Sequence, residues 1–227
     1  MDFLTLTTTC CQIDIEKLFK GGFSTGHGFL REPNDIQSYA ALACIAIQSN
    51  QNDQHGGQSI PDFDYGMANG VKKTFRKLYW TNMGKMLNLL FDIEDGVERM
   101  KKIGAEIMEK HDIYPIIADD NNYKEIEREY LKEIIDEKYI DRLQQKTTKY
   151  ANEEIKRATY QAMEAFVHNL NTMHSRAGAQ IPFSSINYGT DTSPEGRLVT
   201  ENIMLATEAG LGNGETAIFP IHIFKIK

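Results

Sequence analysis

A helical periodicity covers nearly half of this chain and constrains its fold more than any other feature. From residue 67 to about residue 173, apolar side chains recur at the spacing of an amphipathic α-helix. The clearest run is Ile155, Ala158, Ala162, Met163, Phe166, Val167, Leu170 and Met173. Residues 3–13, 181–189 and 217–226 have the composition of strands. Strands separated by helices predict an α/β fold with an unusually long helical middle.

Capping signals predict where three helices begin. Asp14 follows the first predicted strand and fits the cap of a short helix. Asn34 with Gln37 forms a possible capping box before an apolar helix over residues 38–49. Thr192 with Glu195 forms a second possible box before a helix near the end of the chain.

Residues 50–66 are predicted to form a long loop. They combine amides, acids, His55 and the pair Gly56-Gly57. Such a loop would allow close approach of the backbone to a polar ligand, and functional groups concentrate on ordered loops of this kind. A loop held only by its own hydrogen bonds is an equally good interpretation of these residues.

The charge and hydropathy of the chain exclude two classes of partner. The net charge is -7, whereas binding to nucleic acid without sequence preference needs a basic surface. No apolar run approaches the roughly 20 residues that cross a bilayer, and the N-terminus has no basic-then-apolar signal pattern. We therefore expect a cytoplasmic protein that binds neither nucleic acid nor membrane, although a small anion remains an allowed ligand.

The cysteines and histidines give no metal-binding pattern. Cys10, Cys11 and Cys44 form no CxxC pair and are too few for a disulfide scaffold, which favours a reducing compartment. The six histidines show neither HxH nor HExxH spacing. We expect no metal site in this chain and free thiols.

Hydroxyls and thiols gather in residues 7–12. A thiol can give a proton or a hydrogen atom, and neighbouring hydroxyls can hold a sugar or phosphate oxygen. Buried cysteine is also a common small core residue, and the residue types alone favour that interpretation. Successive strand residues face opposite sides, so at most one of Cys10 and Cys11 should face any given site.

Three strings resemble the anaerobic (class III) ribonucleoside-triphosphate reductases, a family of glycyl radical enzymes. They are TTTCCQIDIEKLFKGGFSTGHGFLREP, QSNQNDQHGGQSIP and SRAGAQIPFSSINYGTDTSPEGR, followed by ATEAGLGNGETAIFPI. Their order and spacing match across almost the whole chain, and residues 88–156 match only loosely.

The resemblance implies an α/β fold in which residues 1–227 are the N-terminal part of the catalytic barrel domain. The barrel would be of the glycyl-radical type, with a long helical insertion at about residues 67–175 that forms the dimer face and the effector region. Both ends of the chain look cut from a larger barrel. The fragment alone is expected to be inactive.

The resemblance also implies the reaction, which is radical reduction of ribonucleoside triphosphates to 2′-deoxyribonucleoside triphosphates under anaerobic conditions, for DNA synthesis and repair. Cys10 stands at the position of the catalytic cysteine on the first barrel strand, which assists loss of the 2′ hydroxyl. The cysteine that carries the thiyl radical should lie outside this chain, because no cysteine follows Cys44.

The remaining site residues follow from the same resemblance. Residues 7–9, 54–59 and 184–187 are expected to converge on one cleft, because strand ends and the loops that follow them share one face of a barrel or open α/β sheet. The implied substrate-binding residues are Thr8, Thr9, His55, Gln58, Ser184, Ser185 and Asn187. Lys77, within VKKTFRKLYW, matches a lysine of the effector region and would contact an effector phosphate.

No cofactor is expected within this chain. Full-length family members use a glycyl radical and a C-terminal structural zinc, with ATP or deoxynucleotides as effectors. Formate as reductant, a radical-SAM activating enzyme and a second copy in a homodimer are the further implied partners. Two alternatives stay open, a nucleotide-binding regulatory module without chemistry and another glycyl radical enzyme of the lyase type.

Overall fold

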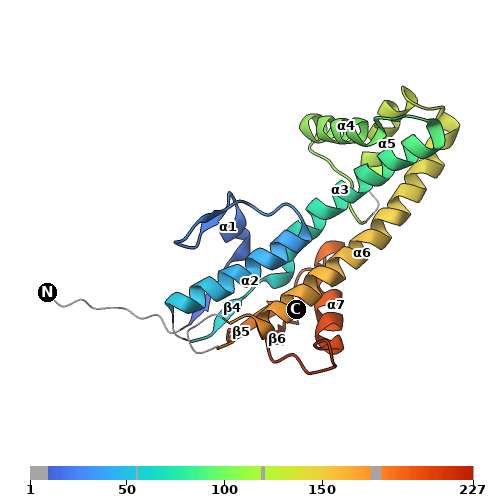
Figure 1. The fold of residues 1–227 in the computed structure, drawn as a ribbon. Helices are drawn as coiled ribbons and strands as arrows, with labels where there is room; N and C mark the ends of the chain where they lie inside the picture. Colours follow the sequence, from blue (N-terminus) through green and yellow to red (C-terminus); the bar gives the residue numbers. More distant parts are fainter. Residues whose placement is uncertain (1–9, 55, 119–120, 175–179, 227) are drawn as a thin grey trace. The chain divides into compact units, whose positions relative to one another are not determined.

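The chain folds into two compact units in a computed structural model that describes residues 10–54, 56–118, 121–174 and 180–226 (Figure 1). Met1–Val71 and Ala158–Lys227 belong to the first unit, and Lys72–Arg157 forms the second. The first unit contains a parallel sheet, and the second is helical. The predicted mixed α/β class with a mostly helical remainder is confirmed.

The elements of the first unit alternate between strands and helices. They are β1 (Cys11–Gln12), α1 (Ile15–Phe19), β2 (Phe23–Ser24), β3 (Phe29–Leu30), α2 (Ile36–Asp53), β4 (Gln58–Ile60), the start of α3 (Phe63–Phe91), the end of α6 (Ile140–Thr172), β5 (Ser184–Tyr188), α7 (Pro194–Ala209) and β6 (Ile221–Phe224). The second unit contains the rest of α3 and α6, with α4 (Gly96–His111), α5 (Asn121–Lys132) and the short 3-10 helix η1 (Glu137–Tyr139). The helical prediction for residues 67–173 is confirmed by α3 to α6.

The sheet of the first unit has the strand order β1-β4-β5-β6, and its neighbouring strands are parallel. Cys11 lies in register with Gln58, and Gln58 with Ser184. Ser185 in turn lies in register with Ile221 of β6. The first residues of β1, β4 and β5 therefore lie side by side, and they form the end of the sheet at which these strands begin.

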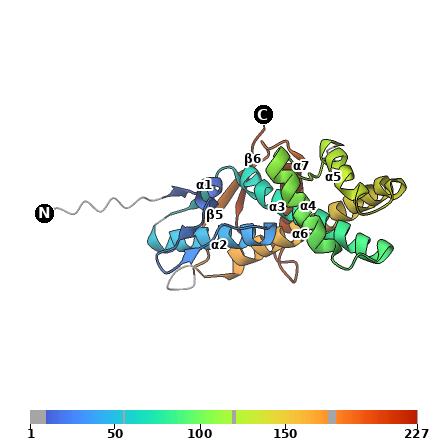
Figure 2. The same cartoon turned by 90° about the horizontal axis from the view of Figure 1, so that it is seen from above.

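The two faces of this sheet differ in burial. Along β5, Ser184, Ile186 and Tyr188 are buried, whereas Ser185 and Asn187 between them are half-buried. Helix α2 packs beside β4 and lies to one side of the strands in Figure 2. On β6, Ile221 and Ile223 share the face of Ser185 and Asn187 and are 57% and 46% exposed.

Two helix starts differ by one residue from the predicted caps. Helix α2 is capped by Asp35, whose carboxylate accepts from the Ser38 N–H at 2.8 Å, and not by Asn34. The fully buried Ile36 is the first helical residue, so the cap must be the residue before it. Helix α7 is capped by Ser193 and not by Thr192, because Pro194 takes the first helical position. The predicted cap at Asp14 is confirmed.

The strand and loop boundaries also need correction. Residues 50–66 do not form one long loop, since α2 continues to Asp53, β4 lies within the segment and α3 begins at Phe63. Among the described residues, the first strand is limited to Cys11–Gln12, and residues 1–9 lie outside them. The last strand is Ile221–Phe224 and does not extend over residues 217–226. The strand predicted within residues 181–189 is confirmed as β5.

The second unit contains a buried carboxyl group. Glu127 on α5 is fully buried, and its Oε2 accepts hydrogen bonds from the Tyr79 hydroxyl and from Gln144 Nε2, both at 2.9 Å. Next to it, Trp80 Nε1 donates to the Tyr123 hydroxyl at 2.9 Å. Burial raises the pKa of Glu127 to about 7, because the charged form loses its hydration.

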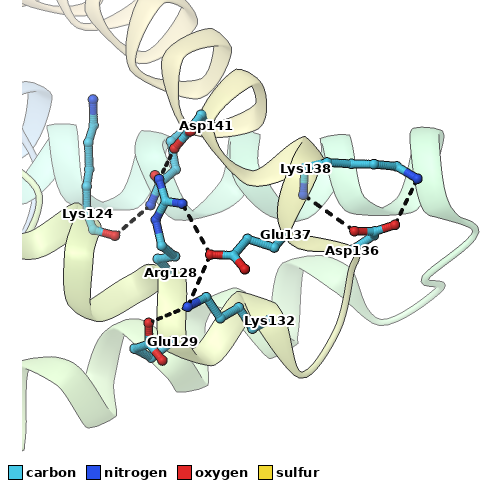
Figure 3. Close-up of polar contacts among 9 residues, drawn as sticks. Lys124, Arg128, Glu129, Lys132, Asp136, Glu137, Lys138 and Asp141 are labelled. Carbon is cyan, nitrogen blue, oxygen red and sulfur yellow. Dashed lines mark hydrogen bonds and ion pairs between the residues drawn. The ribbon is translucent and has the colours of Figure 1, made fainter.

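Ion pairs join α5, η1 and the start of α6 on the surface of the second unit (Figure 3). Arg128 contacts Glu137 and Asp141, and Lys132 contacts Glu129 and Glu137. Lys138 pairs with Asp136 at 2.8 Å. Exposed pairs of this kind contribute little stability each, about 0–1 kcal/mol. These pairs include Asp136 and Glu137 at η1 and Asp141 in the first turn of α6.

Candidate functional site

Polar groups from three strands lie together at the end of the sheet where β1, β4 and β5 begin. The Cys11 N–H donates to Gly57 O at 3.1 Å, and the Gln58 N–H donates to Phe183 O at 2.8 Å. These bonds place the start of β1 beside the segment before β4, and that segment beside the start of β5. These polar groups lie where the strands begin and not where they end. The cleft was expected at the ends of the strands, and that position is corrected.

A cavity of about 400 Å³ opens at this edge. Its lining residues are Gln51, Gly56, Gly57, Gln58, Gln180, Phe183, Ser184, Ser185, Phe219 and Ile221. Two hydroxyls, three side-chain amides and two aromatic rings thus surround one space. A volume of this size is in the range of small-molecule sites, which combine apolar walls with a few polar groups.

Gln58 provides an unsatisfied donor at this cavity. Its side chain is 1% exposed, and its Oε1 accepts from Asn50 Nδ2. Its Nε2 has no hydrogen-bond partner among the described residues. A buried donor left unpaired costs about 1–3 kcal/mol, so a ligand oxygen at this position would stabilise the site.

Three of the expected substrate-binding residues, Gln58, Ser184 and Ser185, line the same cavity. Asn187 is not among the lining residues, although alternation places it on the same face of β5 as Ser185. Thr8, Thr9 and His55 lie outside the described residues.

Cys10 and Cys11 differ in their surroundings. Cys10 directly precedes β1 and is exposed. Cys11 is half-buried and lines a separate cavity of about 540 Å³, together with residues of α1 and α2 such as Lys17 and Asn50. Strand alternation, with Cys11 in register with the buried Gln58, puts the Cys11 side chain on the helix-covered face. Cys10 should therefore face the opposite side, which carries Ser185.

Asp64 holds the turn that follows β5, at the opposite end of this strand. This role was not predicted from the sequence. The buried Asp64 Oδ2 accepts from the backbone N–H groups of Gly189, Thr190 and Asp191 at 2.8, 3.0 and 2.9 Å. The Tyr65 hydroxyl also donates to Thr190 O at 2.9 Å. The available signal was an acid in the first turn of a helix and a glycine after a strand, which is too common to identify a partner more than a hundred residues away.

Comparison with known proteins decides the family. The sequence profile of the family described as "Anaerobic ribonucleoside-triphosphate reductase" matches residues 1–227. The chain belongs to this family. The anaerobic ribonucleoside-triphosphate reductase of Enterobacteria phage T4 is 26% identical over 214 residues, which are 94% of this chain and 26% of the phage protein.

Two bacterial proteins with the same name are also similar to this chain. The protein of that name from Haemophilus influenzae is 30% identical over 219 residues, or 96% of this chain and 23% of its own length. The one from Escherichia coli K12 is 39% identical over 79 residues, which are 34% of this chain and 11% of that protein. The chain thus spans about a quarter of the length of the phage and Haemophilus reductases.

The expected effector residue, Lys77, lies on a basic stretch of α3 in the second unit. Lys77 is exposed and follows Lys72, Lys73 and Arg76. The Arg76 guanidinium lies 3.6 Å from the ring centroid of Tyr114, and burial lowers its pKa. The stretch thus places four cationic side chains within six residues of one helix.

Metal sites and membrane spans can be assessed only over the described part of the chain. None of its histidine, cysteine and acidic side chains form a group of three or more that could hold a metal ion. None of the helices in these residues is both long enough and apolar enough to cross a membrane.

Proposed function

We propose that this chain is the part of an anaerobic ribonucleoside-triphosphate reductase that binds the substrate ribose and donates the proton for loss of its 2′ hydroxyl. Membership of the family supports the reaction. The observation that carries the assignment of the site is the cavity at the start of β4 and β5, where the buried Gln58 amide has a donor with no partner among the described residues, beside Ser184 and Ser185. Cys10 is not among the residues that line this cavity and lies in the chain next to Cys11, whose strand pairs with β4.

In the proposed reaction, a thiyl radical from another part of the enzyme removes the 3′ hydrogen of the ribose. The Cys10 thiol gives a proton to the 2′ hydroxyl, which leaves as water. Formate supplies two electrons and the hydrogen that C2′ gains, and it leaves as carbon dioxide. The 3′ hydrogen atom then returns to C3′, which restores the thiyl radical, and one proton from solvent restores the Cys10 thiol. The balance is one triphosphate, one formate and one proton in, and one deoxynucleotide, one carbon dioxide and one water out.

The sheet supports a larger barrel in the complete enzyme. Parallel sheets are normally covered on both faces, whereas Ile221 and Ile223 remain exposed on β6. We infer that further strands and the radical-bearing loop of the glycyl-radical-type barrel cover this face, and that the chain alone is inactive. The radical, the C-terminal zinc and the activating enzyme would then act outside residues 1–227.

We further propose that the helical second unit serves regulation in a cytoplasmic homodimer. Long helices with apolar stripes and flanking charges can pack against a second copy. ATP or a deoxynucleotide would bind as effector with Lys77 near a phosphate, as a point charge.

The test of the proposed reaction compares two serine variants in the full-length enzyme. Cys10→Ser should keep substrate binding and abolish deoxynucleotide formation, because an alcohol is a far weaker proton donor than a thiol, whose ordinary pKa is about 8.5. Cys11→Ser is the matched control, since its side chain lies on the helix-covered face, and it should mainly cost packing. Product formation by Cys10→Ser together with its loss in a folded Cys11→Ser enzyme would reverse the assignment. Nucleotide binding without turnover in the activated wild-type enzyme would instead favour a regulatory module.

A further inference from the structure

A hydrogen bond between two side-chain amides joins the end of α2 to the start of β4. Asn50 Nδ2 donates to Gln58 Oε1. Gln58 lines the candidate substrate cavity, whereas Asn50 lines the separate cavity that also contains Cys11. Asn50 was not among the predicted site residues, and it is not among those that line the substrate cavity. Its bond to Gln58 is the contact that links it to that cavity.

Regular structure fixes the backbone on both sides of this bond. Asn50 lies in the last turn of α2, and its carbonyl accepts from the Gln54 N–H at 3.0 Å. Gln58 is the first residue of β4, and its N–H donates to Phe183 O at 2.8 Å. Strand β4 pairs with β1 on one side and with β5 on the other. Both side chains therefore start from fixed positions, and the bond between them restricts rotation of the Gln58 amide.

The Gln58 amide has two ends of opposite hydrogen-bonding character. Its oxygen accepts and its nitrogen donates, and both atoms are attached to one carbon in one plane. When Asn50 holds Oε1, the direction of Nε2 is therefore set as well. Gln58 is 1% exposed, and its Nε2 has no partner among the described residues. An oxygen of a ligand in the cavity would satisfy this buried donor.

We propose that Asn50 is a positioning residue, which turns the Gln58 amide so that its N–H, and not its oxygen, is offered to an acceptor oxygen of the substrate. This inference rests on the proposed function, which places the substrate beside Gln58. The Asn50 side-chain nitrogen can only donate, so it selects the oxygen of Gln58. Asn50→Asp has nearly the same shape but can only accept, so it would select Nε2 and leave Oε1 toward the cavity.

A purely structural role of Asn50 predicts a different order of variants. If its bond only stabilised the junction between α2 and β4, the truncation Asn50→Ala should do more harm than the isosteric Asn50→Asp. If Asn50 sets the direction of the Gln58 amide, Asn50→Asp should do more harm to substrate binding. The reason is that Asn50→Ala leaves the amide free to rotate toward the substrate, whereas Asn50→Asp holds it the wrong way round.

The experiment measures the dissociation constant for CTP, and the KM and kcat of CTP reduction, in the full-length activated enzyme. Asn50→Asp should raise the dissociation constant and KM by about tenfold or more, because a buried oxygen then faces the substrate acceptor. Asn50→Ala should raise them by only about threefold, and kcat at saturating CTP should stay within about twofold in both variants. Asn52→Asp makes the same change at an exposed position of α2 and is the matched control.

A double-mutant cycle connects the effect to Gln58. Gln58→Leu should weaken CTP binding by itself, and adding Asn50→Asp should cause no further loss, because the amide that it turns is gone. Additive losses in the double variant would overturn the positioning role. An effect of Asn50→Ala equal to or larger than that of Asn50→Asp would overturn it too, as would an affinity unchanged in Asn50→Asp.

Two further results separate this inference from the proposed function. Weaker binding in Gln58→Leu with unchanged binding in Asn50→Asp would overturn the role of Asn50 and leave the substrate cavity in place. Unchanged CTP binding in Gln58→Leu would overturn the cavity itself, and the role of Asn50 with it. Thermal unfolding checks the fold of each variant. If Asn50→Asp does not fold, Gln58→Glu replaces it, since its carboxylate also presents an oxygen to the cavity, and wild-type CTP affinity in Gln58→Glu would overturn the proposal.

Discussion

The side-chain amide of Asn171 forms hydrogen bonds with both the N–H and the carbonyl group of Phe219. Its Nδ2 donates to Phe219 O at 2.5 Å, and its Oδ1 accepts from the Phe219 N–H at 3.1 Å. The same Oδ1 accepts from Ile218 N–H at 2.8 Å. Because Phe219 lines the candidate substrate cavity, a residue at the end of α6 sets the position of one of its walls.

Replacing Asn171 with alanine should therefore lower the free energy of unfolding by about 1–3 kcal/mol, since two backbone N–H groups and a carbonyl lose their partner. Urea denaturation measures this change. Thr172→Ala is the matched control, because its hydroxyl donates to His168 O within the same helix. A loss equal to that of the control would mean that water replaces the amide without cost.

Replacing Asp64 with asparagine should loosen residues 189–191. Three N–H groups bond to one carboxylate oxygen, and hydrogen bonds to a charged acceptor are about twice as strong as neutral ones. We expect faster hydrogen exchange at the amides of Gly189, Thr190 and Asp191. Asp62→Asn should leave these amides protected, because the Asp62 carboxylate accepts from the Lys225 ammonium and not from the backbone of residues 189–191. Unchanged rates of amide hydrogen exchange in Asp64→Asn would show that the turn is stable without the charge of this carboxylate.

Glu127 should make the stability of the helical unit fall as pH rises. Its pKa is about 7 in the folded state and 4.5 when unperturbed, so the folded state binds more protons between these values. The free energy of unfolding then decreases with pH in this window, by at most about 1.4 kcal/mol per pH unit. Glu127→Gln should remove this slope, because the amide is neutral and can still accept from Tyr79 and Gln144.

The measurement is urea unfolding between pH 5 and pH 8, followed by the fluorescence of Trp80. This is the single tryptophan of the chain, and it bonds to Tyr123 next to Glu127. Glu129→Gln is the control, since that carboxylate is on the surface and pairs with Lys132. Parallel pH profiles for the wild type and Glu127→Gln would contradict a raised pKa.

Reversing the charge of Lys77 should weaken binding of the proposed effector in the full-length protein. A glutamate on this exposed turn of α3 would repel a phosphate, and we expect at least a tenfold rise in the effector dissociation constant. Equilibrium dialysis with ATP and with deoxynucleotides measures it. Lys85→Glu, two turns later on the same helix and also exposed, is the control. Equal affinities in both variants would remove the assignment of Lys77.

The helices could be predicted because their signals are local. The spacing of apolar residues such as Phe166 and Leu170 is a property of one element, and it correctly indicated α6. Helix starts were less certain, because the burial of Ile36 and not the capping pattern alone sets where α2 begins.

The contacts of the site depend on the tertiary fold and could not be predicted in this way. Asp64 meets Gly189 across 125 residues, and Asn171 meets Phe219 across 48. The family resemblance indicated Gln58, Ser184 and Ser185, but only the strand register shows that they share one cavity. The hydrogen bond from Asn50 to Gln58 lies in a segment that was predicted as one long loop, so neither route indicated it.

The unequal burial of the three cysteines should make them react with thiol reagents at three different rates. Cys10 is exposed, Cys11 is half-buried, and Cys44 is buried, with a pKa raised to about 12 by its burial. Thiol reagents react with the thiolate, so they should label the first thiol fast, the second slowly and the third only when α2 separates from its neighbours. The rate of the third labelling event would then report how often the native core opens, without any introduced dye or tag.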